Sequence, residues 1–313
     1  MPDLKVQIDA QATAVFLVAH LGEPVADVTP LTGGYFSHAF AFAWRDGQYV
    51  VRFASARENF DKDRFAHEHF ASASLPIPRV LDIGTTGTEG EFFAISERAR
   101  GVLFQQWGAA RQEAALPAFI ATLDRIHRAD VGETSGYGGF DAQGVGQSAS
   151  WRAYLLGLYD ETLPHFWHGW RSLFRASFLE RDLFERGYAR MLTLLDHCPE
   201  GRALVHNDYM GENVLTDGRT ITGVIDWGNA FYGDCLYDVA SLSLWLPDAT
   251  ERFRRLYGEQ GREIPHFAER IACYRTCQLL DDLRFNAFAD RRNDYAKTRT
   301  QLLAQLDGQH GGA

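Results

Sequence analysis

The feature of this sequence that most limits its possible folds is a polar loop, HNDYMGENVL (residues 206–215), followed by the segment VIDW (residues 224–227). In the loop, Asn213 follows Asp208 by five residues and precedes an apolar pair, and Asp226 ends the second apolar run. Asn and Asp are common in ordinary turns, but turn chemistry alone does not require this order. Phosphoryl transfer requires a base for the attacking hydroxyl and oxygen ligands for magnesium. We therefore interpret Asp208 as a catalytic base, and Asn213 and Asp226 as magnesium ligands.

The N-terminal part of the chain has the patterns of short β-strands. Residues 39–44 (AFAFAW) alternate small and aromatic side chains and, with residues 48–53 (QYVVRF) across a turn, predict a hairpin. A helix over residues 59–73 should follow and end before a Leu-Pro-Ile-Pro run, because a residue that precedes proline disfavours helical backbone. Residues 80–83 and 91–95 predict two more strands.

The rest of the chain is mostly helical in pattern. Helical apolar spacing covers the ranges 114–129, 151–163, 177–195, 236–245 and 266–288. The glycine-rich residues 132–147 predict a surface loop, since no strand precedes them and no βαβ unit follows. We expect an α+β fold with two lobes: a small, β-rich nucleotide-binding lobe at residues 1–98, and a larger, mostly helical catalytic and substrate-binding lobe at residues 99–313.

Composition and charge narrow the classes of partner. The sequence is 46% hydrophobic and 23% charged, as in folded globular proteins. It contains neither a run of about 18 apolar residues nor a secretory signal pattern, so we expect a cytoplasmic protein. The formal net charge of −10 disfavours nucleic acids and anionic membranes and suits a cationic small molecule. The four cysteines lack metal-binding spacing and should be free, and we expect a monomer.

Several segments of the chain resemble the aminoglycoside phosphotransferase family, whose members are related to protein kinases. The resemblance lies in the loop HNDYMGENVL and in the segments FASASLPIPRVLDIG (70–84), TSGYGGFDAQGVGQ (134–147), NVLTDGRTITGVIDW (213–227) and FYGDCLYDVA (231–240). It is greatest to the members that phosphorylate hygromycin B. The resemblance implies a bilobal protein-kinase-like fold, Mg²⁺, ATP or GTP as co-substrate, and phosphorylation of a hydroxyl on an aminocyclitol antibiotic.

The same resemblance suggests which residues bind the nucleotide phosphates. Gly33 and Gly34, just before the predicted hairpin, would let the backbone approach a phosphate, and Ser37 would add a hydroxyl contact. A kinase lysine is expected on the second strand of the hairpin, but Arg52 occupies that place. An arginine can neutralise the α- and β-phosphates with its planar fork of donors; the alternative is a surface arginine on an edge strand.

Two further positions follow from the family pattern. Counting along the predicted helix favours Asp63 as the acidic partner of Arg52, with Glu68 as the competing candidate. Backbone groups from Glu97 to Ala99, just past the last predicted strand, would bind the adenine ring. Backbone contacts leave no mark in the side chains, so this expectation rests on the order of elements alone.

An acceptor that carries ammonium groups should be bound by carboxylates. The candidate acceptor residues follow the metal segment or lie on the late helix, and they are Asp234, Asp238, Trp245, Asp281, Asp282 and Arg284. Asp281 lies where the resembling enzyme has an aspartate, whereas Arg284 replaces an aromatic residue and would repel a cationic drug. Each of these residues has a simpler alternative as a capping or surface ion-paired residue.

The sequence leaves other functions open. A metabolic kinase of the same fold would accept a sugar, amino alcohol or amino acid, and a macrolide kinase would have an apolar acceptor site. A degenerate kinase would bind nucleotide without transferring phosphate, but the intact Asp208, Asn213 and Asp226 argue against it. An antibiotic kinase remains the leading hypothesis.

Overall fold

The computed structural model describes residues 6–33, 36–162 and 167–308. Packing divides the chain into two compact units, each made of segments distant in sequence. Unit 1 contains residues 1–135, 140–145 and 208–230, and unit 2 contains residues 136–139, 146–207 and 231–313. This partition differs from the predicted lobe division at residue 98, which stays a prediction.

Unit 1 is built on a five-stranded antiparallel sheet with the strand order β1-β2-β3-β5-β4. Its strands are β1 (Ala26–Leu31), β2 (Ser37–Trp44), β3 (Gly47–Ala54), β4 (Val80–Thr85) and β5 (Phe92–Glu97). Helix α1 (Ala10–Leu21) precedes the sheet, and α2 (Glu58–Phe70) connects β3 to β4. The predicted hairpin, helix and two later strands are confirmed. Helix α1 and strand β1 were not predicted; α1 is apolar on most of its surface, so it has little amphipathic period.

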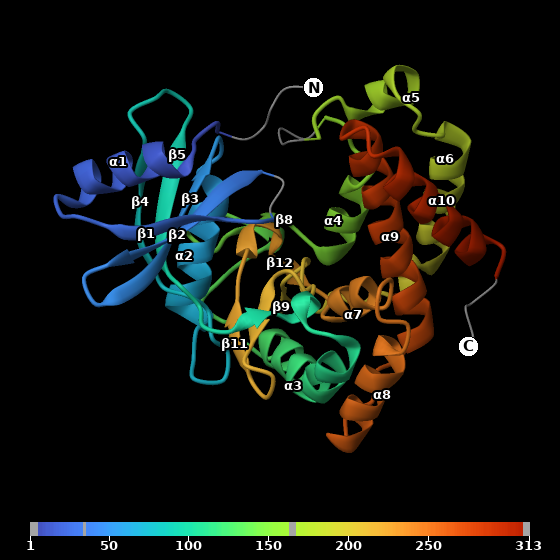
Figure 1. Cartoon of the computed structure of the whole chain (residues 1–313). Coiled ribbons are helices and arrows are strands. Elements are labelled where there is room, and N and C mark those ends of the chain that lie inside the picture. Colours follow the sequence, from blue (N-terminus) through green and yellow to red (C-terminus); the bar gives the residue numbers. More distant parts are fainter. Residues whose placement is uncertain (1–5, 34–35, 163–166, 309–313) are drawn as a thin grey trace. The chain divides into compact units, whose positions relative to one another are not determined.

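The pleat of the sheet decides which side chains face each helix. Val51 and Phe53 of β3 pack with Leu17 of α1 in one apolar cluster. Helix α1 lies against one face of the sheet (Figure 1). Ala54 lies on the opposite face and packs with Phe60 of α2. Because successive residues of a strand point to opposite faces, the position between Val51 and Phe53 faces α2. This is the position of Arg52.

The remainder of unit 1 carries the polar loop found in the sequence. A three-stranded sheet has the order β11-β10-β6, formed by β6 (Val102–Leu103), β10 (Val214–Thr216) and β11 (Ile221–Val224). The other elements are the 3₁₀ helices η1 (Phe104–Gln106) and η4 (Trp227–Asn229) and the helix α3 (Ala109–His127). The β-hairpin of β10 and β11 therefore connects the loop HNDYMGENVL to the segment VIDW.

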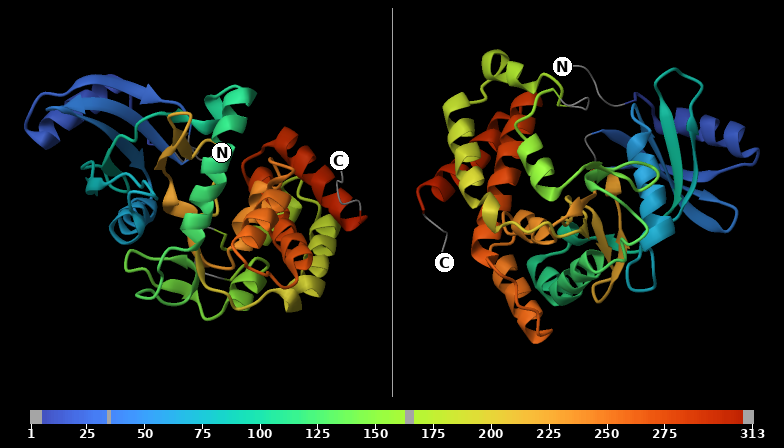
Figure 2. Two further views of the ribbon diagram at one scale, coloured as in Figure 1. Left: turned by 90° about the horizontal axis from the view of Figure 1, so that it is seen from below. Right: turned by 180° about the vertical axis from the view of Figure 1, so that it is seen from behind.

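Unit 2 is mainly helical. Its helices are α4 (Trp151–Gly157), η2 (Trp170–Ser172), α5 (Leu173–Ala176), α6 (Arg181–Leu194), η3 (Leu195–His197), α7 (Leu236–Leu242), α8 (Ala249–Glu259), α9 (Phe267–Phe288) and α10 (Arg292–Leu306). The long helix α9 lies beside α6 and α10 (Figure 2), and Leu280 of α9 packs with Phe184 and Leu302 in one apolar core. Together with the β-rich N-terminal region, this confirms the predicted α+β class.

The glycine-rich segment predicted as a loop contains two short strands, which corrects the prediction. Strands β7 (Tyr137–Phe140) and β8 (Gly146–Ser148) form a four-stranded sheet with β12 (Phe231–Gly233) and β9 (Ala203–Val205), in the order β8-β7-β12-β9. A Cβ atom on Gly136 would lie 2.3 Å from the carbonyl oxygen of Gly146. The glycines therefore permit close strand pairing, which a composition-based reading of the segment as a loop did not allow for.

Other helix boundaries also differ from the predictions. Helix α4 ends at Gly157, well before the predicted residue 163, and glycine is a poor residue for continuing a helix. Helices α8 and α10 were not predicted at all. Within the described residues, no helix is both long enough and apolar enough to cross a membrane.

Candidate active site

The loop between β9 and β10 holds Asp208 and Asn213 together. The Asn213 side-chain nitrogen donates to the main-chain oxygen of Asp208 and to its Oδ2, each at 2.9 Å. The Tyr209 hydroxyl donates to the Phe119 carbonyl at 2.8 Å and so ties the loop to α3. The loop fixes the orientation of the Asp208 carboxylate through bonds made inside unit 1.

The β10–β11 hairpin brings Asp226 next to Asn213. Val214 pairs with Val224, and the Ile225 N–H donates to the Asn213 carbonyl at 2.9 Å. Asn213 therefore lies just before β10, and Asp226 lies just after the end of its partner strand β11. Asp226 itself has φ 63° and ψ 69°, a left-handed conformation that is uncommon for residues other than glycine and that neighbouring contacts must maintain.

Arg52 and Asp63 form an ion pair, as the sequence predicted. The Arg52 guanidinium donates to Asp63 Oδ2, and Asp63 Oδ1 accepts from the main-chain N–H of Trp227 at 2.7 Å. The competing candidate, Glu68, is exposed on the same helix and is not the partner of Arg52. Asp63 thus connects the arginine of β3 to the residue that follows Asp226.

The charges in this part of unit 1 influence one another strongly. Burial disfavours the Arg52 guanidinium, but the Asp63 and Asp226 carboxylates outweigh it and raise the pKa of Arg52. Burial and then the Asp63 carboxylate raise the pKa of Asp226, while Arg52 and a hydrogen bond from the Gly228 main chain oppose the rise. A divalent cation beside Asp226 would relieve this repulsion between carboxylates.

The donor set fits a magnesium ion bound together with phosphates. In Asn213 the amide nitrogen makes both bonds to Asp208, so the amide oxygen is the atom that remains for a cation. Among the described residues, no three His, Cys, Asp or Glu side chains gather into a metal site. Magnesium in phosphate-transfer sites uses one or two protein carboxylates and completes its shell with phosphates and water, and Asn213 with Asp226 meets that requirement.

Lys62 is a polar residue in this region to which the sequence analysis gave no role. It is 4% exposed, and its Nζ donates to the carbonyl oxygen of Gly228 at 2.6 Å. Burial lowers the pKa of Lys62 to about 8, although nearby carboxylates oppose the change. A signal was present in the sequence: Phe65 and Ala66 follow Lys62 by three and four residues, so Lys62 lies on the buried face of its helix.

The other residues predicted to bind the nucleotide lie in or near the N-terminal sheet. Gly33 has φ 120°, which favours glycine, and lies between β1 and β2; Gly34 lies outside the described residues. Ser37 is the first residue of β2. Glu97 ends β5, and its N–H donates to the Arg79 carbonyl at 2.9 Å. Ala99 lies against Gly223, where an added Cβ would be 2.6 Å from the Ala99 Cβ.

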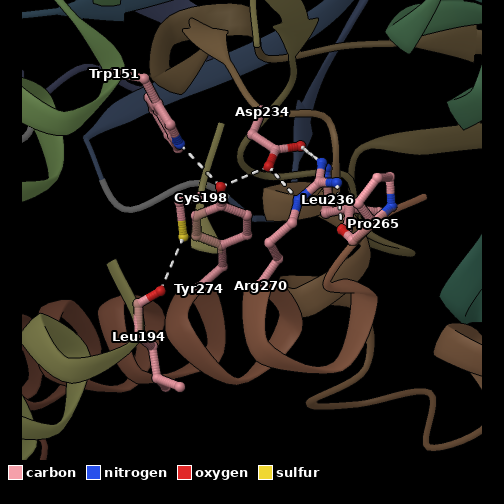
Figure 3. A network of polar contacts seen from close by, with 8 residues as sticks. All are labelled: Trp151, Leu194, Cys198, Asp234, Leu236, Pro265, Arg270 and Tyr274. Atoms are coloured by element: carbon pink, nitrogen blue, oxygen red, sulfur yellow. Dashed lines mark hydrogen bonds and ion pairs between the residues drawn. The ribbon is translucent and has the colours of Figure 1, made fainter. Parts of the chain in front are cut away.

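Asp234, predicted to contact the acceptor, is buried in unit 2 (Figure 3). Its carboxylate accepts from Arg270 at 2.6 and 2.8 Å and from the Tyr274 hydroxyl at 2.5 Å. The Leu236 N–H donates to it at 3.1 Å, and Trp151 donates to the Tyr274 hydroxyl at 3.0 Å. A carboxylate with 3% exposure and these partners is structural, which argues against the predicted contact.

Asp238 is also a buried structural residue and not a surface acid. Its two carboxylate oxygens accept from the main-chain N–H groups of His206 and Asn207 at 2.9 and 2.8 Å. Gln278 of α9 donates to the Asn207 side-chain oxygen at 3.1 Å. Asp238 is 2% exposed, so the structure argues against the predicted acceptor contact and assigns it to the segment that leads into Asp208.

The other predicted acceptor residues are arranged differently. Arg284 is buried, donates to Asp281 and to the Leu158 carbonyl, and lies 4.0 Å from the ring centre of Trp167. Its charge is therefore neutralised, and the expected repulsion of a cationic drug does not follow. The Asp282 side chain is exposed in part of its surface, but desolvation by the surrounding protein and then the neighbouring Asp281 carboxylate raise the pKa of Asp282 to about 7. Trp245 is 37% exposed.

Comparison with known proteins places this geometry in a family. Residues 27–280 match the phosphotransferase enzyme family. The chain is 38% identical over 247 residues to hygromycin-B 4-O-kinase of Escherichia coli, an alignment that covers 78% of this chain and 69% of that protein. A thermostable mutant of aminoglycoside phosphotransferase APH(4)-Ia, solved with AMP-PNP and hygromycin B, is 33% identical with a TM-score of 0.84, covering 96% of this chain and 100% of that chain.

A more distant structure supports the fold alone. The GDP complex of an aminoglycoside 2'-phosphotransferase-IIIa mutant is 15% identical with a TM-score of 0.67, over 97% of this chain and 99% of that chain. These matches confirm the predicted kinase-like fold. The chain therefore belongs to the phosphotransferase enzyme family and is a small-molecule kinase with a hydroxyl group as acceptor.

Proposed function

We propose that this protein transfers the γ-phosphoryl group of a nucleoside triphosphate to a hydroxyl of hygromycin B or of a closely similar aminocyclitol. Asp208 accepts the proton of the acceptor hydroxyl while the oxygen of that hydroxyl bonds to the γ-phosphorus. The bond from the γ-phosphorus to the bridging oxygen breaks, and the nucleoside diphosphate leaves with that electron pair. The products are the phosphorylated antibiotic, the diphosphate and a proton.

The observation that carries the proposal is the connected set of Asp208, Asn213 and Asp226 inside one unit. The Asn213 amide bonds to the Asp208 carboxylate, and the hairpin register brings Asn213 beside Asp226. A base that is oriented before the substrate binds lowers the entropic cost of reaching the transition state. Turn formation alone does not require a bond between the side chains of Asp208 and Asn213.

Asn213 and Asp226 would hold magnesium, and Arg52 would contact the triphosphate. Magnesium, when bound, neutralises the charge of the phosphate oxygens. Asp63 holds Arg52 by the ion pair, so the guanidinium is restrained before the nucleotide enters. We assign Gly33, Gly34 and Ser37 to the phosphates and the backbone from Glu97 to Ala99 to the base, by the order of elements.

The acceptor identity follows from the relatives and from unit 2. The relatives named above act on hygromycin B or were solved with it. Asp281 and Asp282 are consecutive residues of α9, one partly exposed and the other exposed, and would attract an aminocyclitol that carries ammonium groups. Asp234 and Asp238 are not part of the proposed acceptor site, since their carboxylates are used inside unit 2.

The experiment is a phosphorylation assay with ATP and GTP against a panel of hygromycin B, kanamycin, spectinomycin and streptomycin, extended to sugars, amino alcohols and a macrolide. Product mass and ³¹P NMR identify the modified hydroxyl. We expect turnover with hygromycin B to exceed that with every other acceptor. Turnover with a metabolite or macrolide and none with hygromycin B would contradict the proposal.

A further inference from the structure

Lys62 is a buried cation that none of the steps above uses. It lies on α2 next to Asp63, and its Nζ is 2.6 Å from the carbonyl oxygen of Gly228. Burying an ammonium group carries a large desolvation cost unless charges or hydrogen bonds compensate it. The compensation at Lys62 comes from one main-chain carbonyl, from the carboxylates of Glu58, Asp63 and Asp226, and from the ring of Phe140, whose centre lies 4.9 Å from Nζ.

The carbonyl that Lys62 binds belongs to the turn just after Asp226. The Gly228 N–H contributes a hydrogen bond to the Asp226 carboxylate, while its C=O accepts from Lys62. One residue, Gly228, therefore connects the ammonium group to the metal-ligand carboxylate through its N–H and its C=O. Moving Gly228 would change both bonds.

Helix α2 holds this turn at three points. Asp63 accepts from the Trp227 N–H at 2.7 Å, and Lys62 donates to the Gly228 carbonyl. A Cβ added to Gly228 would lie 2.8 Å from Asn59 Cγ, so Asn59 packs directly on the glycine. These contacts surround the turn in which Asp226 has left-handed backbone angles, a conformation that is uncommon for residues other than glycine.

We propose that Lys62 is a positioning residue for the magnesium carboxylate: by holding the Gly228 carbonyl it fixes the turn that aims Asp226. This inference rests on the proposed function, in which Asp226 is a magnesium ligand. Lys62 itself would contact neither the substrate nor the metal. Its effect reaches the metal through Gly228 and Asp226, in the way that residues behind a metal ligand orient it.

The test compares Lys62→Met, which keeps length and apolar character but removes the donor, with Lys62→Arg, which keeps charge and donor. Lys297→Met is the matched control, because Lys297 is an exposed lysine of α10 paired with Asp294. Calorimetry with AMP-PNP, in the presence and absence of Mg²⁺, gives the gain in nucleotide affinity that the metal supplies. Thermal unfolding shows that each variant is folded at the assay temperature.

We expect Lys62→Met to lose about 10- to 100-fold of the magnesium-dependent gain, with metal-free affinity nearly unchanged. Lys62→Arg should recover part of the loss, and Lys297→Met should match the wild type. If magnesium raised the nucleotide affinity of Lys62→Met as much as that of the wild type, the inference would be overturned. An equal loss of affinity with and without magnesium would also overturn it, because that would mean Lys62 supports only the fold of α2.

A further variant, Asp226→Asn, separates this inference from the proposed function. If the wild type shows no magnesium-dependent gain, or Asp226→Asn retains the full gain, the assignment of Asp226 fails and the inference about Lys62 fails with it. If Asp226→Asn loses the gain and Lys62→Met keeps it, the proposed function stands and only the inference is overturned.

Discussion

The two units of the chain use acidic residues in contrasting ways. In unit 1, Asp63 pairs with Arg52 and accepts from the Trp227 N–H beside Asp226, and Asp208 accepts from Asn213. In unit 2, the carboxylates of Asp234 and Asp238 are used in buried internal bonds, whereas Asp282 is exposed and the partly exposed Asp281 pairs with Arg284 on α9. In unit 1, these acidic side chains belong to the candidate active site. In unit 2, the presence of an acidic residue does not by itself distinguish a structural carboxylate from one that would bind the substrate.

Whether a carboxylate can bind a ligand depends on the groups with which it already bonds. Asp234 meets a buried guanidinium and a tyrosine hydroxyl, so it has no capacity left for a drug. Asp226 instead lies near another carboxylate, and its repulsion with Asp63 favours an added cation. Substitutions of these acidic residues should therefore change different properties, namely catalysis or nucleotide binding in unit 1 and stability or antibiotic binding in unit 2.

The largest effect is expected at Asp208. Asp208→Ala removes the base from the acceptor hydroxyl, so kcat should fall by about 10²- to 10⁴-fold, while the Kd for AMP-PNP changes little. Steady-state kinetics and calorimetry measure the two quantities on the same preparation. A large loss of nucleotide affinity with proportionate loss of activity would show that the role of Asp208 is assigned wrongly.

Asp234→Ala should destabilise the folded protein. It leaves the Arg270 guanidinium buried without its carboxylate, which should lower the free energy of unfolding by about 3–5 kcal/mol. Denaturant titration measures this loss. The matched control is Asp294→Ala, which removes an exposed partner of Lys297 and should cost about 1 kcal/mol or less. Stability equal to the control, together with weaker antibiotic binding, would return Asp234 to the acceptor site.

Arg52→Ala should act on the nucleotide without abolishing the chemistry. Loss of charge-assisted hydrogen bonds to the triphosphate should weaken its binding by roughly 10- to 100-fold. Glu68→Ala, an exposed acid on α2, serves as the control and should bind nucleotide as the wild type does. If Arg52→Ala retains both nucleotide affinity and turnover, Arg52 is a structural partner of Asp63 and nothing more.

The smallest expected effect concerns the pH dependence of antibiotic binding. The pKa of Asp282 is raised to about 7, so the carboxyl is mostly protonated below that value and ionised above it. A cationic antibiotic favours the ionised form, and its affinity should rise by up to about 5-fold between pH 6 and 8 through an exposed pair. Asp282→Asn should lose this rise. Comparing the two proteins at each pH removes the contribution of the amines of the drug, and identical profiles would exclude Asp282 from binding.

The parts of the site that local sequence determines were predictable. Asp208, Asn213 and Asp226 lie on one loop and one hairpin, so their spacing alone brings them together. The pleat of β3 places Arg52 towards α2, and the period of two residues that does so is visible in the sequence. Counting along the family pattern favoured Asp63 over Glu68, and the ion pair with Arg52 confirms that choice.

The missed parts depend on tertiary partners. The burial of Asp234 is decided by Arg270, which is distant in the sequence, and that of Asp238 by the backbone of His206 and Asn207. Lys62 was passed over because its partner is a main-chain carbonyl, and a carbonyl has no sequence signature. A pattern reports which face of an element is apolar, but it does not report which polar group will be satisfied there.

We propose that Asn213 and Asp226 share one magnesium ion bound to the triphosphate, with Asp208 beside the acceptor hydroxyl. A crystal structure of the protein with Mg²⁺ and AMP-PNP would show whether they do. We predict the metal at about 2.0–2.1 Å from the Asn213 amide oxygen and from an Asp226 carboxylate oxygen. A nucleotide bound with its phosphates away from both residues, or the Asp208 and Asp226 carboxylates facing separate cavities, would contradict the account.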